Sequence, residues 1–395
     1  MRTKSDVPES PDRDRDPSGR PDSPQRGGSL REPPGREFRV GVDMSILRHP
    51  HAGTARYAIE LLSAMRSAAA PSETLIPVAG FPRAGRGHPI RRYVNLTSDL
   101  VWWSAGAGVT CAAKRMDAWF SPANILPLAL PRGQVVTIHD ANFLIDPGAY
   151  EPGYRSYATR MFRHSARHAD RILTDSHWSA HQLETLLGAP PERIVVAYPG
   201  LDHSLQVTPA QRDPAFPKTY ALFVGKTEPH KNVGILLEAW RTRIPRDLHL
   251  VIAGRPGRDD ERLRAIVARD RILRELVHFE GAVDEPRLAR LYEDATCFLF
   301  PSRAEGFGFP PLEAMARGVP TAVANSSSLP EVTDGGALIF DPDDPEGVAD
   351  ICSRLTNDGG ERARLAESGR RIAGRYAWRE TAQTAWRAIR EVRGA

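Results

Sequence analysis

The sequence predicts an α/β protein with two domains, each built on a parallel sheet covered by helices. Short apolar runs typical of buried strands alternate with helical segments from residue 38 almost to the end of the chain. The alternation runs twice, and a polar, proline-bearing stretch at residues 205–218 separates the two series. A chain of 395 residues is long enough for two domains with full hydrophobic cores. Each series follows the order of strand, turn and helix that is typical of a Rossmann-like domain.

The first series begins with a strand at residues 37–43. The helix after Gly53 carries its apolar side chains at Tyr57, Ile59, Leu61, Leu62 and Met65. Further strands are expected at residues 75–79, 117–120, 134–138, 171–174 and 194–198, and helices at 91–104, at 154–170 and from His177 onward. Gly53 either serves a tight turn or faces a ligand, and the residue type alone leaves both open.

The second series begins with a strand at residues 220–224 and a helix near Val233. Its further strands are expected at residues 248–254, 277–279, 297–300, 321–325 and 338–340. Helices are expected at 257–275 and 286–295, near Phe309 and from Trp378. Residues 1–37 are rich in charge and proline and poor in large apolar side chains, so we expect a disordered tail there.

Composition narrows the classes of function. The net charge of +4 does not indicate a nucleic-acid partner, although it permits anionic ligands or anionic lipid surfaces. Cys111, Cys297 and Cys352 are far apart in the sequence, which favours buried thiols in a reducing cytosol over disulfides or a metal site. The sequence has no apolar run long enough for a transmembrane helix and no apolar core of a signal peptide. We therefore expect a cytoplasmic protein.

The most informative stretch is SRAEGFGFPPLEAMARGVP at residues 302–320, directly after the strand at 297–300. Glycines at positions 306 and 308 precede Pro310 and Pro311, and prolines in the first turn are typical of a helix start. A strand, a glycine-bearing loop and a helix start together offer backbone N–H groups and the positive end of a helix dipole to an anion. Phosphate is the obvious candidate.

Two carboxylates, Glu305 and Glu313, lie on either side of these glycines. Glu313 alone would be explained as a first-turn acid that complements the helix dipole. Glu305 is harder to explain, because an acid beside a phosphate-binding loop repels the ligand unless it faces a neutral, hydroxylated part of it. With seven residues between them, the two glutamates resemble the E-x7-E signature of the retaining GT-B glycosyltransferases usually called family 4. The resemblance covers roughly residues 38–390.

The resemblance implies a GT-B fold, in which two Rossmann-like domains face a central cleft. It implies an acceptor domain at residues 38–205, a nucleotide-sugar domain at 206–376 and a closing helix at 377–395 that crosses back to the first domain. It also implies that Glu305 accepts hydrogen bonds from the donor sugar and Glu313 from the ribose. Transfer with retention by same-face attack, with a leaving-group oxygen helping to take the acceptor proton, is implied in the same way.

Other residues are candidates for the same site. Lys226 and Lys231 follow the first strand of the second series and can stabilise a leaving diphosphate, although two solvated lysines are the alternative. The resemblance places an arginine at the first of these positions. Lys226 keeps the positive charge but cannot make the bidentate hydrogen bonds of a guanidinium group. Backbone groups of Gly306, Phe307 and Gly308 complete the expected donor site. His139 ends a strand and resembles the family's cleft histidine near the donor sugar, and Gly53 resembles the loop near the phosphates.

No metal and no cofactor is predicted. Asp341, Pro342 and Asp343 superficially match a D-x-D metal site, but the following Asp344 and Pro345 fit a turn and a helix N-cap better. The expected partners are a nucleotide-sugar donor, with GDP-mannose first and a UDP- or dTDP-sugar as the alternative, and a hydroxyl acceptor.

Two other functions and one further partner stay open. The functions are a sugar-nucleotide epimerase or hydrolase and an inactive binding protein on the same fold. Peripheral contact with the inner face of a membrane is a hypothesis, based on Trp102 and Trp103 near Arg91 and Arg92 and on the basic helix at 154–170. Core tryptophans beneath a solvated basic face are the alternative.

Overall fold

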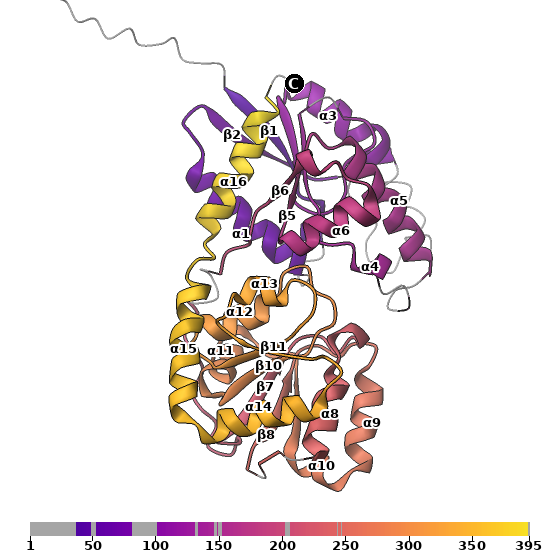
Figure 1. Ribbon diagram of the computed structural model, residues 1–395. Coiled ribbons are helices and arrows are strands. Elements are labelled where there is room, and N and C mark those ends of the chain that lie inside the picture. The colour runs from indigo at the N-terminus through magenta and orange to yellow at the C-terminus, as the bar shows by residue number, and fades with distance from the viewer. Residues whose placement is uncertain are drawn as a thin grey trace, which may run out of the picture. The chain divides into compact units, whose positions relative to one another are not determined.

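The computed structural model describes residues 37–48, 53–80, 101–130, 133–145, 148, 152–201, 206–242, 244–245 and 247–393 (Figure 1). The tail expected at residues 1–37 lies outside the described residues except for Glu37. The first part of the helix expected at 91–104, with Arg91 and Arg92, also lies outside them.

The first sheet has six parallel strands in the order β2-β1-β3-β4-β5-β6. The strands are β1 (Phe38–Asp43), β2 (Glu73–Val78), β3 (Ala118–Ser121), β4 (Gln134–Thr137), β5 (Arg171–Thr174) and β6 (Ile194–Val196). The connecting helices are α1 (Gly53–Ala68), the π-helix η2 (Trp102–Gly106), α3 (Ala107–Ala113), α4 (Asn142–Ile145), α5 (Pro152–His168) and α6 (His177–Leu187). Short 3₁₀ turns are η1 (Ser45–Arg48) and η4 (Pro191–Arg193). We call the part of the chain that carries this sheet the first half.

Two different groups of helices cover the two faces of the first sheet. Val135 packs in a cluster with residues of α1 and α16 (Trp378–Glu391), whereas its neighbour Val136 packs in a cluster with residues of η2, α5 and α6. Adjacent residues of a strand point to opposite faces, so this division follows directly from the strand geometry. Both faces are buried, which explains the continuous apolar runs in the sequence.

The second sheet has six parallel strands in the order β12-β11-β10-β7-β8-β9. The strands are β7 (Tyr220–Val224), β8 (His249–Ala253), β9 (Val277–Gly281), β10 (Cys297–Phe300), β11 (Thr321–Ala324) and β12 (Leu338–Phe340). The helices are α8 (Val233–Thr242), α9 (Asp260–Arg269), α10 (Arg271–Leu276), α11 (Glu285–Asp294), α12 (Phe309–Ala316), α13 (Leu329–Thr333), α14 (Pro345–Asn357) and α15 (Gly359–Ala373), with the 3₁₀ turn η5 (Pro229–Lys231). We call this part the second half.

The strand order places a ligand crevice in the second half. The chain enters the sheet at its centre with β7, adds β8 and β9 on one side, and then adds β10, β11 and β12 on the other. In open α/β sheets, ligands bind at the carboxyl ends of the two strands where this order reverses. Here those strands are β7 and β10. Their carboxyl ends carry the Lys226–Lys231 segment and the glycine motif.

The last helix lies against the first half, although it follows the second half in sequence. In Figure 1, α16 runs beside β1 and α1, while α15 lies beside the second sheet. Trp386 of α16 is buried, and its indole N–H donates to the carbonyl of Met65 in α1 at 2.9 Å. Arg390 binds the carboxylate of Glu73 in β2. These contacts anchor the C-terminal helix to the first sheet.

The sequence prediction of an α/β fold with two parallel sheets is confirmed, and every expected strand is present within two residues at each end. Two details differ. The single helix expected at 257–275 is two helices, because Asp270 accepts hydrogen bonds from the N–H groups of Ile272 and Leu273 and so starts α10. Ile59 of α1 is exposed. For Trp102 the structure agrees with the alternative of a core tryptophan, and its side chain is not free to enter a headgroup layer.

Within the described residues, no helix combines the length and the apolar character needed to cross a membrane.

Candidate functional site

The loop between β10 and α12 is held by three consecutive serines from the loop after β11. We call residues 302–308 the glycine loop. The hydroxyl of Ser326 donates to the carbonyl of Ser302 at 2.5 Å, and the Glu305 N–H donates to the hydroxyl of Ser327 at 3.0 Å. The hydroxyl of Ser328 reaches the carbonyls of Glu305 and Phe307 at 3.0 and 2.9 Å. The shape of the glycine loop is therefore fixed by side chains and does not depend on a ligand.

Gly308 is required at the start of α12. Its φ of +105° lies in the region that other residues rarely adopt, and a Cβ there would lie 2.9 Å from a methyl group of Leu329. Gly308 is the N-cap of α12, with prolines at the next positions. The first backbone N–H groups of a helix have no partner within the helix. Since Pro310 and Pro311 carry no N–H, Phe309 and the preceding glycine loop supply the donors that this end of α12 offers to an anion.

Glu305, within the glycine loop, forms an ion pair with Lys231. The Nζ atom of Lys231 lies 2.5 Å from Oε1 of Glu305, and both side chains are largely shielded from solvent. Lys231 ends the turn after β7 and also lies over the ring of Phe300, 5.2 Å from its centroid. The pair explains how a carboxylate can lie beside a phosphate-binding loop, since its charge is balanced within the site.

Lys226 lies at the edge of this site. Its side chain is exposed and pairs with Glu228, which also accepts a hydrogen bond from Arg258 at 2.8 Å. Burial raises the pKa of Glu228, but the two cations outweigh this effect and the pKa lies below its ordinary value. The charge of Lys226 is therefore balanced locally and weakened by solvent.

Glu313 is buried in the second turn of α12, so it is not the first-turn acid that the sequence suggested, and it has partners for both carboxylate oxygens. Oε1 accepts from Arg56 of α1 at 3.0 Å, and Oε2 accepts from the hydroxyl of Tyr292 at 3.1 Å. Burial and the Glu313 charge hold the pKa of Tyr292 well above its ordinary value, so the phenol stays a donor. Glu313 thus links the second half of the chain to α1 of the first half.

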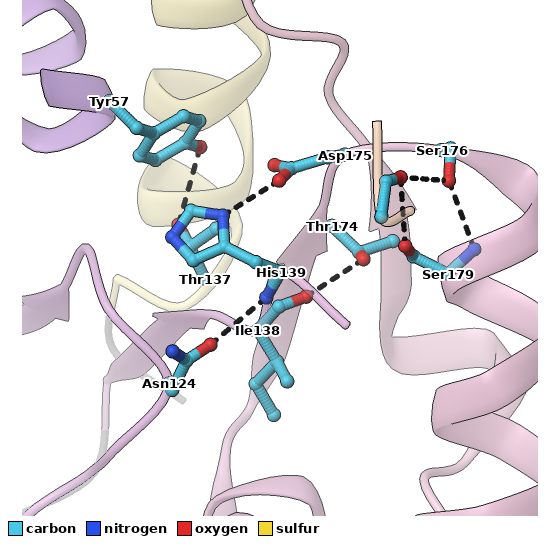
Figure 2. A network of polar contacts seen from close by, with 10 residues as sticks. Tyr57, Asn124, Thr137, Ile138, His139, Thr174, Asp175, Ser176 and Ser179 are labelled. Atoms are coloured by element: carbon cyan, nitrogen blue, oxygen red, sulfur yellow. Dashed lines mark hydrogen bonds and ion pairs between the residues drawn. The ribbon is translucent and has the colours of Figure 1, made fainter. Parts of the chain in front are cut away.

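His139 lies in a buried polar network at the carboxyl end of β4 (Figure 2). Its Nδ1 lies 2.7 Å from Oδ2 of Asp175, its backbone N–H donates to Asn124, and the ring of Tyr57 meets it edge-on at 4.6 Å. Burial lowers the pKa of His139, but the charges of Asp175 and Asp140 more than compensate, and the pKa lies above its ordinary value. Nε2 of His139 and Oδ1 of Asp175 are buried without a hydrogen-bond partner of normal geometry among the described residues.

The glycine loop contacts the first half directly at Gly306. The hydroxyls of Ser176 and Ser179 at the start of α6 donate to the carbonyl of Gly306 at 2.7 and 3.1 Å (Figure 2). A Cβ at Gly306 would lie 2.9 Å from the carbonyl oxygen of His139 and 3.1 Å from a carboxylate oxygen of Asp140. The ends of β4 and β5 therefore meet the glycine loop, and Gly306 allows this close approach.

The structure brings some of the candidate residues together and separates others. Glu305, Lys231, Gly306 and Gly308 gather around the glycine loop, with the backbone of His139 against it. The ring of Phe307 is buried against Phe309 and Tyr376, so only its backbone can face a ligand. Gly53 is the exposed first residue of α1, and a Cβ there would meet nothing within 4 Å, so neither packing nor a close approach demands glycine.

Several residues of the site were given no role in the reaction from the sequence. They are Arg56, Asp140, Asp175, Ser176, Ser179 and the serines at 326–328. The positions of Asp140, Asp175 and the serines are readable from the sequence, because each group comes shortly after a strand that ends at the ligand-binding edge of its sheet. The sequence did not show which of them meet the glycine loop.

The D-x-D-like segment forms the expected turn and cap. Asp344 accepts from the N–H of Gly347 at the start of α14, and Asp343 pairs with Arg303 at 2.5 Å. Across the part of the chain that the structure describes, no group of three or more His, Cys, Asp or Glu side chains could hold a metal ion.

Comparison with known proteins gives the family. Residues 209–372 match the family model "Glycosyl transferases group 1", and residues 51–205 match "Glycosyltransferase Family 4". An O-antigen chain mannosyltransferase B from Escherichia coli is 32% identical over 282 residues, which covers 67% of this chain and 72% of the relative. The chain belongs to the group 1 glycosyltransferases. It is therefore an enzyme that transfers a sugar.

A second relative and a solved structure are also similar to this chain. A D-inositol 3-phosphate glycosyltransferase from Acidothermus cellulolyticus is 33% identical over 233 residues, which covers 54% of this glycosyltransferase and only about half, 52%, of the relative. The solved structure of sucrose-phosphate synthase from Thermosynechococcus elongatus is similar with a TM-score of 0.73 and 18% identity, covering 90% of this chain and 98% of that chain. The latter similarity supports the GT-B fold of this glycosyltransferase.

Proposed function

We propose that this glycosyltransferase moves a hexose, with mannose as the first choice, from a nucleotide-diphosphate sugar to a hydroxyl acceptor with retention of configuration. The observation that carries the proposal is the Glu305–Lys231 pair at the glycine loop, opposite the end of β4. GDP-mannose is the preferred donor because a relative at 32% identity is named as a mannosyltransferase. A UDP- or dTDP-sugar is the alternative donor.

The roles follow from where charge develops during transfer. Negative charge builds on the leaving diphosphate as the bond to the sugar breaks, and Lys231 and the N–H groups at Gly306, Phe307 and Gly308 are placed to stabilise it. Lys226 adds a weaker, exposed charge. Glu305 accepts hydrogen bonds from the sugar hydroxyls, and it keeps this role because Lys231 balances its charge.

Glu313 and His139 take supporting roles in the proposal. Glu313 accepts from the ribose hydroxyls while it is held by Arg56 and Tyr292. His139 contributes positive charge near the donor sugar, since Asp175 holds its pKa above the ordinary value. Gly53, the first residue of α1, contributes only its backbone in this proposal.

The experiment that tests the proposal separates transfer from the other reactions of nucleotide sugars. The protein is incubated with GDP-mannose, UDP-glucose or dTDP-glucose, with and without methyl α-mannoside as an acceptor probe, and in the presence of EDTA. We expect one donor to give nucleoside diphosphate and a new glycoside that keeps the anomeric configuration, with no loss of rate in EDTA. Conversion of a donor to its epimer without an acceptor would contradict transfer. Loss of activity that only Mg²⁺ or Mn²⁺ restores would contradict a metal-free site.

We also propose peripheral contact with anionic lipid through α5. Arg155, Arg160, Arg163 and Arg167 line one groove along this helix, together with His164 and His168. A basic surface of this kind attracts anionic headgroups. Co-sedimentation with anionic vesicles at physiological salt tests it. Equal pelleting of the wild type and an Arg160→Ala/Arg163→Ala variant would count against this surface.

A further inference from the structure

The two halves of the chain together cap the start of α6. Within the first half, the hydroxyl of Ser176 accepts from the N–H of Ser179 at 3.0 Å. The N–H groups of His177 and Trp178 instead donate to the two carboxylate oxygens of Glu331 in α13, at 2.7 and 3.0 Å. A carboxylate suits this place, because the amino end of a helix carries partial positive charge. The second half therefore supplies part of the cap of a first-half helix.

Glu331 is itself held in place by a second contact with the first half. The hydroxyl of Tyr198, just after β6, donates to Oε1 of Glu331 at 2.7 Å. Burial and the bond to Glu331 raise the pKa of Tyr198 above its ordinary value, so the phenol stays a donor. The carbonyl of Tyr198 in turn accepts from the hydroxyl of Thr381 in α16 at 2.6 Å. The carboxylate of Glu331 is therefore fixed between α6 and the segment after β6.

Glu331 also connects the two supports of the glycine loop. On one side, Ser328 directly precedes α13 and its hydroxyl reaches the carbonyls of Glu305 and Phe307. On the other side, the hydroxyls of Ser176 and Ser179 donate to the carbonyl of Gly306 (Figure 2). The glycine loop thus lies between the serine segment at 326–328 and the start of α6, and Glu331 binds the second of these from the helix that follows the first.

The contact at Gly306 sets the orientation of a peptide group in the glycine loop. A trans peptide is planar, and its C=O and N–H point in opposite directions. When the two serine hydroxyls hold the carbonyl of Gly306, they therefore also fix the direction of the N–H of Phe307. This N–H is one of the donors that the proposed function assigns to the leaving diphosphate. Donors that are oriented before the reaction stabilise developing charge best, because they need no reorganisation.

We propose that Glu331 is a positioning residue for sugar transfer. Its carboxylate holds the start of α6 against the glycine loop, so that Ser176 and Ser179 fix the peptide group between Gly306 and Phe307. The inference rests on the proposed transfer reaction. Glu331 acts through α6 and not by contact with the reacting atoms, so its loss should change turnover more than nucleotide binding.

Glu331→Ala removes both acceptor oxygens from the start of α6. We expect kcat for the donor to fall about tenfold, because the N–H of Phe307 is no longer held in one direction. Affinity for GDP should stay within about threefold, since Lys231 and the serines at 326–328 are unchanged. Glu331→Gln keeps one acceptor oxygen and should retain more of the turnover than Glu331→Ala. A wild-type kcat in Glu331→Ala would overturn the inference.

Asp270→Ala is the matched control for the loss of a cap. Asp270 also accepts two backbone N–H groups at the start of a helix, from Ile272 and Leu273, but that helix is α10, which packs against α8 and α9. We expect this variant to lower the melting temperature and to keep wild-type turnover. If it lowers kcat as much as Glu331→Ala does, loss of stability explains both results and Glu331 has no positioning role.

A double-mutant cycle tests whether Glu331 acts through the serines. Ser176→Ala/Ser179→Ala removes the hydroxyl contacts with Gly306 and should lower kcat by itself. Adding Glu331→Ala to this variant should cost little further turnover, since the contact that Glu331 supports is already gone. Losses that multiply in the combined variant would contradict this route.

Hydrogen exchange of backbone amides tests the contact without any turnover. Glu331→Ala should speed exchange in peptides that cover residues 176–179 and 303–308, and Asp270→Ala should leave both unchanged. Unchanged exchange at 303–308 in Glu331→Ala would overturn the inference. If exchange responds as expected but the wild type neither binds GDP or UDP nor turns over GDP-mannose, UDP-glucose or dTDP-glucose, the proposed function fails and the support of the glycine loop by Glu331 stands.

Discussion

The two glutamates of the glycine motif lie in regions that are held together in different ways. Glu305 is paired with Lys231, and both come from loops at the carboxyl ends of neighbouring strands in one sheet. Glu313 is held by Tyr292 of its own half and by Arg56, which belongs to α1 of the other half. The Glu305 region can therefore form within the second half alone, whereas the Glu313 region requires the first half to be in place. We expect the first region to govern the chemistry and the second to govern donor binding.

The largest expected effect comes from Lys231→Ala. The substitution removes a cation from the leaving diphosphate and leaves the charge of Glu305 unpaired beside it, so both binding and turnover should suffer. We expect kcat/KM for the donor to fall by on the order of a thousandfold. The rate at which nucleoside diphosphate is released from the donor measures turnover. Calorimetric titration with GDP measures binding.

The exposed lysine of the same segment is the matched comparison for Lys231. Lys226→Ala removes a charge that is already paired with Glu228 and open to solvent, so its effect should be much smaller. Equal losses from both variants would contradict the different roles assigned to the two lysines.

Asp175→Asn tests whether His139 is charged, through the pH dependence of the protein's melting temperature. Because the pKa of His139 is raised in the folded protein, the stabilisation from this pair is fully present below the unfolded value of about 6.5 and is lost as pH rises through the folded pKa. The variant should therefore lower the melting temperature more at pH 6 than at pH 9. Asp117→Asn serves as control, because Asp117 accepts a hydrogen bond from the Arg39 backbone N–H at 2.9 Å at the opposite, amino end of the same sheet. A loss that is the same at both pH values would contradict a charged His139.

Glu313→Gln probes the connection between the halves and should have the smallest effect on chemistry. The amide can still accept from Tyr292, but the ion pair with the half-exposed Arg56 is lost. We expect KM for the donor to rise several-fold with little change in kcat, as for a contact remote from the breaking bond. Arg56→Ala should give the same pattern. A lower kcat at unchanged KM in either variant would place Glu313 at the reaction centre.

The sequence predicted the sheets well because buried parallel strands are read from local apolar runs. The start of α12 was equally readable, since Gly308, two prolines and the following helix formers are local signals. The pairs that complete the site are not local. His139 and Asp175 are 36 residues apart, and Arg56 and Glu313 are 257 apart, so they meet only through the strand order and the packing of α1.

Two features of the fold were not settled by the local sequence signals. The charged pattern at 257–275 continues across Asp270, and its capping hydrogen bonds divide the segment into α9 and α10. For Trp102 the sequence left a membrane contact and a core position open, and the structure buries its side chain in the core of the first half. The cap at Asp270 is local, whereas the burial of Trp102 depends on contacts that no short window of sequence contains.

The central claim is that Glu305 acts on the sugar and not on the nucleotide, and Glu305→Ala tests it most directly. Affinity for GDP or UDP and turnover of the nucleotide sugar are measured on the same preparation. Removal of the carboxylate frees Lys231 for the diphosphate, so nucleotide affinity should be unchanged or slightly higher. Turnover should fall on the order of a hundredfold, because the hydrogen bonds to the sugar tighten in the transition state. Sugar transfer by Glu305→Ala at the wild-type rate would contradict the account.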